Sequence, residues 1–297
     1  MPDRHRIPRV LSIAGSDSGA GAGIQADLKA FAACGVHGMT AITAITAQNT
    51  VEVTAVHPIP PDVIVAQVRA VASDIGVDAV KIGMLGDRAT IEAVARALTE
   101  LPATTPVVLD PVMVAESGAT LLDPQARTTL IETLLPRATV VTPNLPEART
   151  LVGGPQGSPD AARYAGEDRE VHELARAIHA LGPQIVVVTG GHRDDATDVF
   201  FDGRRLVELP GDRHPAGATH GSGCTHSSVL AARLAHGDDP LEAARTARER
   251  ASDAVAQGLR EIGAGAGPVD ILGIASKANK TGSSGPRAEP AESTVLT

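Results

Sequence analysis

Aromatic residues are almost absent from this 297-residue chain, which contains three Phe, one Tyr and no Trp. Proteins that bind single-stranded nucleic acid stack the bases on aromatic rings, and proteins that bind duplexes carry a basic face. The formal net charge here is −9 at pH 7. The composition therefore argues against nucleic acid as a partner.

Lysine is equally scarce, and none of Lys29, Lys81, Lys277 and Lys280 follows a glycine. A P-loop requires a Gly-Lys pair, so this phosphate-binding motif is excluded. If the protein binds phosphate, backbone N–H groups, a metal ion or arginine must meet most of the charge.

Long apolar runs are also missing, since none approaches the roughly 18 residues of a membrane-spanning helix. The apolar stretch after Arg9 is interrupted by Ser16 and Asp17, which does not fit a signal peptide. Cys34 and Cys224, the only two cysteines, are expected to stay reduced. The sequence thus predicts a cytoplasmic protein that does not contact membranes.

Short apolar runs alternate with amphipathic segments along the chain, which is typical of a parallel sheet covered by helices on both faces. The predicted strands are 9–14, 39–47, 79–82, 106–109, 138–142 and 184–189. Predicted helices include 23–34, 60–74, 87–100, 123–135, 168–181, 223–235 and 241–259, with Asp87 and Asp123 as N-caps and a hairpin at 198–209. Residues 153–166 are expected to form an exposed loop or flap, and the chain from Ser276 onward is predicted to be disordered.

Polar and glycine residues follow several of the predicted strands, at 15–17, Asp110, Asn144 and Gly190. Ligands of such sheets bind beyond the carboxyl ends of the strands. We therefore expect a binding site at this edge, shaped by the glycine-rich loop 14–23. Its 21–26 segment fits the loose dinucleotide fingerprint, but no acidic residue lies at the required distance for a ribose.

The segment 218–225 is a second glycine-rich loop that runs into a helix. Consecutive N–H groups at a helix start form an anion-binding site. Cys224 falls in the first helical turn, where the pKa of a thiol is lowered, so it is a candidate base or nucleophile. The alternative is a small residue packed against the sheet. A metal site with His220 and His226 is disfavoured, because the spacing matches no standard zinc pattern.

Two other pairs of polar residues are candidates with plain structural alternatives. Asp27 and Gln48 could bind a flat heterocycle through paired donors and acceptors, or they could be capping or surface residues. Asn144 and Glu147 open a helix, where the carboxylate could hold Mg²⁺ through water or could serve only the helix dipole.

Taken together, these motifs resemble the hydroxymethylpyrimidine/phosphomethylpyrimidine kinase family of the ribokinase-like fold. The resemblance runs in order from about residue 10 to residue 273. It is carried by the segments 14–17, 22–29, 43–50, 81–85, 109–113, 142–147, 190–192 and 220–225.

The resemblance implies a three-layer α/β kinase domain over 1–275 and a tail over 276–297. It implies that MgATP phosphorylates 4-amino-5-hydroxymethyl-2-methylpyrimidine and then the monophosphate, in thiamine biosynthesis, and that the protein is a homodimer. The implied catalytic residues are Cys224, as base, and the anion-hole residues Gly221, Ser222 and Gly223. The implied pyrimidine pocket contains Gly15, Asp27, Gln48, Met84 and Val112. Asp110, Thr189, Gly191 and Ala218 would flank the nucleotide, and Asn144 and Glu147 would position Mg²⁺.

One departure from the family pattern concerns Thr189, where many members carry a lysine that reaches the ATP phosphates. Here Arg193 or the metal would have to substitute, or the affinity for ATP differs. A pyridoxal kinase of the same fold is the nearest alternative. A non-catalytic pyrimidine-binding regulator is more distant, because the anion-hole glycines and Glu147 are both present. A dinucleotide oxidoreductase has only the loose fingerprint in its favour.

Overall fold

Six buried apolar runs form the parallel part of one sheet in the computed structural model, which describes residues 6–123, 125–153, 167–192, 196–215 and 217–282. These strands are β1 (Arg9–Asp17), β2 (His37–Gln48), β4 (Ala79–Ile82), β5 (Val107–Leu109), β6 (Val140–Val141) and β7 (Ile185–Val188). Antiparallel strands β3 (Val53–Pro58), β8 (Asp198–Phe201) and β9 (Leu206–Leu209) complete it. Within the described ranges the order is β3-β2-β1-β4-β5-β6-β7-β8-β9.

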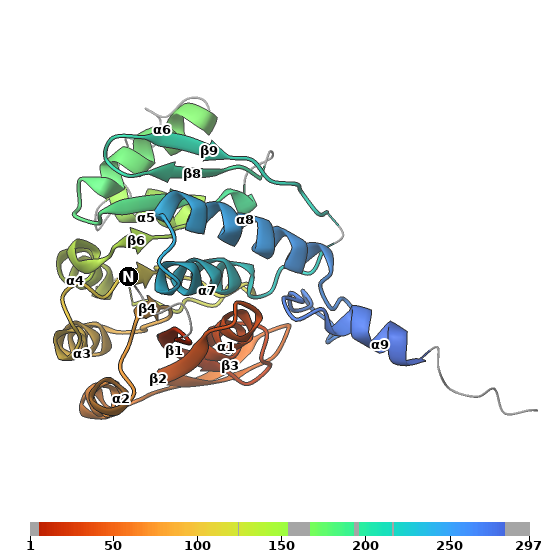
Figure 1. Cartoon of the computed structure of the whole chain (residues 1–297), viewed down its shortest axis with the longest axis horizontal. Helices are drawn as coiled ribbons and strands as arrows, with labels where there is room; N and C mark the ends of the chain where they lie inside the picture. The colour runs from red at the N-terminus through yellow and green to blue at the C-terminus, as the bar shows by residue number, and fades with distance from the viewer. Residues whose placement is uncertain (1–5, 124, 154–166, 193–195, 216, 283–297) are drawn as a thin grey trace, which may run out of the picture.

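Alternation of side chains along the central strands produces two cores, one on each face of the sheet. On β1, Leu11 and Ile13 belong to one core, whereas Val10 belongs to the other. The first core is covered by α2 (Pro61–Asp74), α3 (Arg88–Ala97), α4 (Ala126–Thr133), α5 (Leu145–Val152) and α6 (Glu167–His179). The second is covered by α1 (Gly23–Ala33), α7 (Ser222–Ala235) and α8 (Pro240–Ala256), as Figure 1 shows.

The predicted three-layer α/β architecture is therefore confirmed, and the predicted strand 79–82 has the observed bounds. Asp87 caps α3 by accepting a hydrogen bond from the Thr90 N–H, as expected. Asp123 does not cap α4, whose N-cap is Gln125. The edge strand β3 was not predicted, because its largely exposed residues lack the alternation of a half-buried strand.

The predicted disordered tail is wrong for residues 276–282, which belong to helix α9 (Ile274–Gly282). The two carboxylate oxygens of Asp270 accept hydrogen bonds from the N–H groups of Ile274 and Ala275 and so stabilise the start of this helix. Residues 283–297, most of the predicted flap at 153–166, and Arg193 lie outside the described residues.

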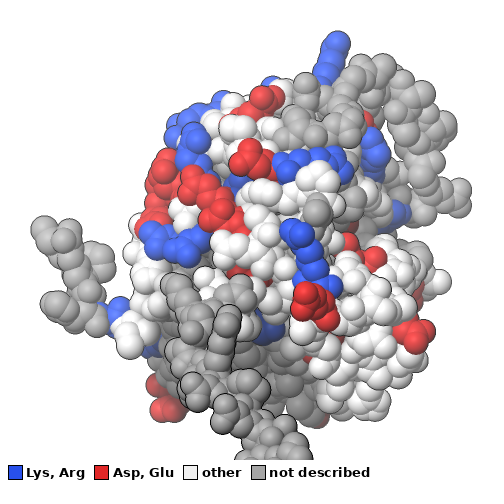
Figure 2. Space-filling model, turned by 90° about the vertical axis from the view of Figure 1, so that its right-hand side faces the viewer, with Lys and Arg blue, Asp and Glu red and all other residues white. Residues whose placement is uncertain are grey.

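Acidic and basic side chains are interspersed on the molecular face in Figure 2, with no gathered basic patch. Among the helices of the described residues, none has the length and apolar character needed to cross a membrane.

Candidate active site

A pocket of about 420 Å³ opens at the carboxyl edge of the parallel strands, between the ends of β1, β5, β6 and β7 and the start of α7. Most of the predicted site residues line it: Gly15, Gln48, Met84, Asp110, Val112, Asn144, Glu147, Thr189, Gly191, Gly221, Ser222, Gly223 and Cys224. The structure thus places these residues together at one pocket beyond the strand ends. Asp27 and Ala218 do not line the pocket.

The anion-binding loop before α7 is held against the loop after β1. His220 Nε2 lies 3.1 Å from Asp17 Oδ2, and the Asp17 carboxylate also accepts the N–H groups of Gly19, Gly21 and Ala22. Burial raises the pKa of Asp17, but the hydrogen bonds from His220 and the backbone outweigh it and leave the pKa below its ordinary value. A carboxylate thus fastens the two glycine-rich loops together.

Gly221 makes this contact possible. Its φ is +84°, and a Cβ at this position would collide with the carbonyl oxygen of Gly21. Glycine alone meets both demands, because it tolerates positive φ and has no Cβ. The left-handed turn then directs the first N–H groups of α7 into the pocket.

Replacing Gly221 by alanine should therefore displace the anion-binding loop and lower kcat by about 10²-fold or more, the typical effect of losing an oxyanion donor. The matched control is Gly237→Ala, which has the same positive φ (+89°) but no atom within 4 Å of the added Cβ. Steady-state kinetics of both purified variants test the expectation. If both lose the same activity, backbone strain and not the collision is responsible.

The environment of Cys224 corrects the expected direction of its pKa. Burial raises the pKa of this thiol to about 12, and the nearby Asp27 and Asp110 carboxylates add to the rise. Lys81 and the Gly23 N–H act in the opposite direction but do not offset it. The sequence argument expected the helix N-terminus to lower the pKa of Cys224, but desolvation raises that pKa by more. In the free protein, Cys224 is a protonated thiol.

Asp27 forms a buried ion pair instead of meeting a heterocycle. Its Oδ1 accepts hydrogen bonds from Lys81 Nζ (2.8 Å) and Ser228 Oγ (2.7 Å), and its Oδ2 accepts one from Ser12 Oγ (2.5 Å). Both charged side chains are fully buried. In this structure the Asp27 oxygens face Lys81 and the two serines, and Asp27 does not line the pocket, so its implied pyrimidine contact stays a prediction. Its part is to hold Lys81 in the pocket floor.

Lys81 is a pocket residue that the sequence argument did not include. Its Nζ lies 4.0 Å from Asp110 Oδ2. Burial lowers the pKa of Lys81, but Asp27, Cys224 and Asp110 together raise it above its ordinary value. The ammonium group is therefore a fixed positive charge beside the Asp27 and Asp110 carboxyl groups and the Cys224 thiol. The sequence could have indicated Lys81, because a lysine in a buried apolar strand requires an acidic partner nearby.

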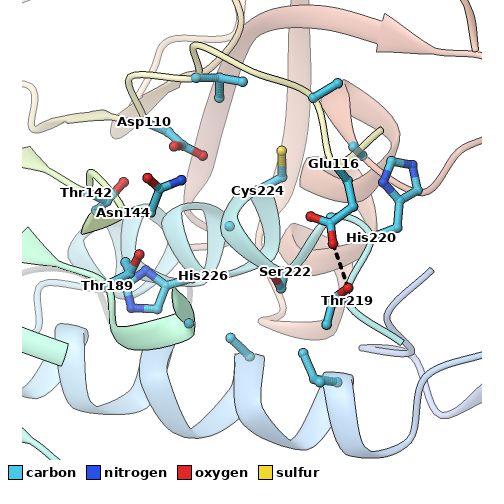
Figure 3. Close-up of a pocket in the computed structure, with 18 of the residues that line it drawn as sticks. Asp110, Glu116, Thr142, Asn144, Thr189, Thr219, His220, Ser222, Cys224 and His226 are labelled. Carbon is cyan, nitrogen blue, oxygen red and sulfur yellow. Dashed lines mark hydrogen bonds between the residues drawn. The ribbon is translucent and has the colours of Figure 1, made fainter. Parts of the chain in front are cut away.

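Two buried carboxyl groups, Asp110 and Glu147, form the acidic wall of the pocket. Burial and the charge of Asp110 raise the pKa of Glu147 to about 8, and burial likewise raises the pKa of Asp110. Asn144 and Glu147 form a capping box, in which the Asn144 side chain accepts from the Glu147 N–H and Glu147 Oε2 accepts from the Asn144 N–H. Figure 3 shows the Asp110 and Asn144 side chains side by side.

This donor set fits a hydrated Mg²⁺ ion. Burial raises the pKa of both carboxyl groups, and a divalent cation would stabilise their charged forms. Mg²⁺ binds through few carboxylates while keeping several waters. No group of three or more His, Cys, Asp or Glu side chains in the described part of the chain could enclose a metal. The pocket therefore suits a metal shared with a substrate and not one held by protein alone.

The adjoining wall is formed by the end of β7 and the start of β8. Thr189 pairs with Asn144 in an isolated bridge, and the Gly190 N–H donates to Asp198 Oδ1 at 2.7 Å. Ala218, predicted to flank a nucleotide, is buried and would contact a Cβ placed on Gly258. Its neighbour Thr219 lines the pocket instead and donates to Glu116 Oε1 at 2.8 Å (Figure 3).

The fold and this pocket define a small-molecule kinase of the ribokinase-like class. A profile described as phosphomethylpyrimidine kinase matches residues 17–270, and the chain belongs to this family.

Two curated relatives are hydroxymethylpyrimidine/phosphomethylpyrimidine kinases. The one from Rhizobium meliloti (strain 1021) is 50% identical over 262 residues, covering 87% of this chain and 95% of the relative. The one from Bacillus subtilis (strain 168) is 42% identical over 267 residues, covering 89% and 94%. Among solved structures, the pyridoxal kinase from Staphylococcus aureus matches with a TM-score of 0.79 and 36% identity, covering 91% of this chain and 95% of that one.

Proposed function

We propose that the protein phosphorylates 4-amino-5-hydroxymethyl-2-methylpyrimidine with ATP and then phosphorylates the monophosphate to the diphosphate, in thiamine biosynthesis. The observation that carries this proposal is one pocket in which a thiol, an anion-binding helix start and an acidic wall meet. The family and the names of the curated relatives support it.

Each wall has a part in this reaction. Gly15, Gln48, Met84 and Val112 surround the proposed pyrimidine end of the pocket, near Cys224. The N–H groups at the start of α7 would bind the transferred phosphoryl group, because they point at it with the positive end of the helix dipole. Bound Mg²⁺ would neutralise the phosphate oxygens beside Asp110, Asn144 and Glu147.

Pyridoxal phosphorylation is the second candidate, because a pyridoxal kinase matches this fold closely, including one solved with AMP-PCP and pyridoxal at a TM-score of 0.78. A coupled ATP-consumption assay with the aminopyrimidine, its monophosphate and pyridoxal, with product masses recorded, separates the two. The proposal expects mono- and diphosphate products of the pyrimidine. Phosphorylation of pyridoxal alone would overturn it.

We also propose that the protein is a homodimer that uses the β2–β3 edge. Ile45, Val51 and Val56 are 45–54% exposed there. Glu52 is the only acidic or basic residue other than histidine between residues 37 and 58. In the described chain, β3 has no neighbour on its outer side, and such edges invite pairing. A solution mass of two chains is expected, and Val56→Lys should reduce it to one.

A cytoplasmic location is part of the same proposal, because ATP and the small metabolites that it would phosphorylate meet in that compartment. Cell fractionation of the host with an antibody against the chain would test it.

A further inference from the structure

Four buried polar atoms on one wall of the pocket make no hydrogen bond of good geometry among the described residues, although two of them, Asp198 Oδ2 and His226 Nε2, lie 3.1 Å apart. They are Asp198 Oδ2, Arg248 Nε and both ring nitrogens of His226. The three side chains are 1%, 12% and 5% exposed, and all three line the pocket. Buried polar groups are nearly always paired, so an unpaired group at a cavity wall indicates a ligand.

Three different elements bring this cluster together. Asp198 begins β8, and His226 lies four residues after Ser222 on α7, so both α7 side chains project from the same face of the helix. Arg248 comes from α8 and donates to the carbonyl oxygen of Ala196. Asp198 stands between the two basic side chains, with Oδ2 3.1 Å from His226 Nε2 and Oδ1 3.7 Å from Arg248 Nε.

The cluster has more donors than it can use. Asp198 Oδ1 already accepts the Gly190 N–H, and its 3.7 Å separation from Arg248 Nε is too long for a hydrogen bond, so the Arg248 Nε donor has no protein acceptor in the described part of the chain. A histidine held through one ring nitrogen has its other nitrogen available for a ligand. The missing partner is therefore an acceptor with several oxygens.

The other basic side chains that are buried in the pocket are already engaged. Lys81 is bound to Asp27, and His220 is bound to Asp17. His226 and Arg248 also lie on the side of the pocket where Thr189 and Ser222 are found, as Figure 3 shows for His226. A polyphosphate chain that starts at the N-terminus of α7 would reach this wall.

We propose that His226, positioned by Asp198 and supported by Arg248, contacts the phosphate chain of the nucleotide. The inference rests on the proposed use of ATP. In this proposal the side chains make a charge-assisted contact with the phosphates, in addition to the contacts of the backbone N–H groups and the metal. It also gives the cluster a function beyond joining α7, α8 and β8.

Calorimetric titration with adenosine, ADP and AMP-PCP tests the proposal on the full chain. His226→Leu should weaken ADP and AMP-PCP binding by about tenfold or more and leave adenosine unchanged, because only the phosphates lose a contact. His226→Gln retains an amide donor and should recover part of the affinity. In kinetics, the KM for ATP should rise while the KM for the aminopyrimidine stays constant.

His236→Leu is the matched control, since His236 is an exposed histidine just beyond the same helix. Equal losses for adenosine and the nucleotides, or no loss at all, would show that the cluster is structural and would overturn the proposal. If His226→Leu does not fold, the same comparison with His226→Gln and Arg248→Gln decides. A wild-type protein that binds ADP but does not phosphorylate the pyrimidine would refute the proposed function and leave this inference intact.

Discussion

Cys224→Ala is expected to slow phosphorylation of the hydroxymethylpyrimidine by about 10²–10⁴-fold, the usual range for loss of a general base. The second phosphorylation should be slowed much less. The first step removes a proton from a primary alcohol, whose pKa is high. The second step begins from a phosphate group that is already ionised at neutral pH, so it has less need of a base.

The raised pKa of Cys224 sharpens this expectation. At about 12, it means that the resting group is a thiol and that a thiolate is scarce at neutral pH. The thiol must therefore lose its proton before it can accept one from the alcohol, and the Lys81 ammonium, which lowers the pKa of Cys224, favours that thiolate. The chemistry of the first step is therefore expected to depend on the cysteine and the lysine together.

Single-turnover measurements with each substrate in turn test the difference between the two steps. Cys34→Ala is the control, since Cys34 is the other free cysteine, lies at the end of α1 and does not line the pocket. Its activity should match the wild type in both steps. Equal losses in the two steps for Cys224→Ala would rule out a base and assign the cysteine to packing.

Lys81→Met should destabilise the fold by about 3–5 kcal/mol, because it leaves a buried carboxylate without its counter-charge. The two charged groups of the pair are fully buried at 2.8 Å, and the remaining partners of Asp27 are uncharged serines. Denaturant unfolding followed by circular dichroism measures the loss. The matched surface control is Arg69→Met. Arg69 forms an ion pair with Glu100 in which the two side chains are 63% and 29% exposed, so its loss should destabilise the fold much less.

A double variant separates the structural and chemical parts of Lys81. Replacing both members of a buried pair by apolar residues is often neutral for stability, so Lys81→Met with Asp27→Leu should regain much of the lost stability. It should not regain the first phosphorylation, because the ammonium beside Cys224 is still missing. A double variant that recovers both would limit the pair to folding.

The position of the pocket at the carboxyl edge of the sheet could be predicted from the sequence, because it depends on local sequence patterns. Strands ending in Asp110 and Asn144 must place these side chains at one edge of a parallel sheet, and a glycine-rich loop before a helix indicates an anion site. The capping box of Asn144 and Glu147 is likewise local, since its two members are three residues apart.

The parts that sequence reasoning missed depend on contacts between distant residues. Lys81 and Asp27 are 54 positions apart, and no periodicity links them. The helix dipole at Cys224 is visible in the sequence, but the desolvation that outweighs it is set by the closed packing of α7 on the sheet. Asp198, His226 and Arg248 come from three separate elements and were not expected to meet.

The network around Asp27 joins Ser12 on β1, Lys81 on β4 and Ser228 on α7 to helix α1. Each of these contacts lies beneath the pocket, so the floor can open only when the whole hydrophobic interior opens with it. The rim of the pocket is less tightly packed, since Val114 in the polypeptide between β5 and α4 lines the pocket and is 53% exposed. Local opening is therefore expected to cost less free energy at the rim than at the floor.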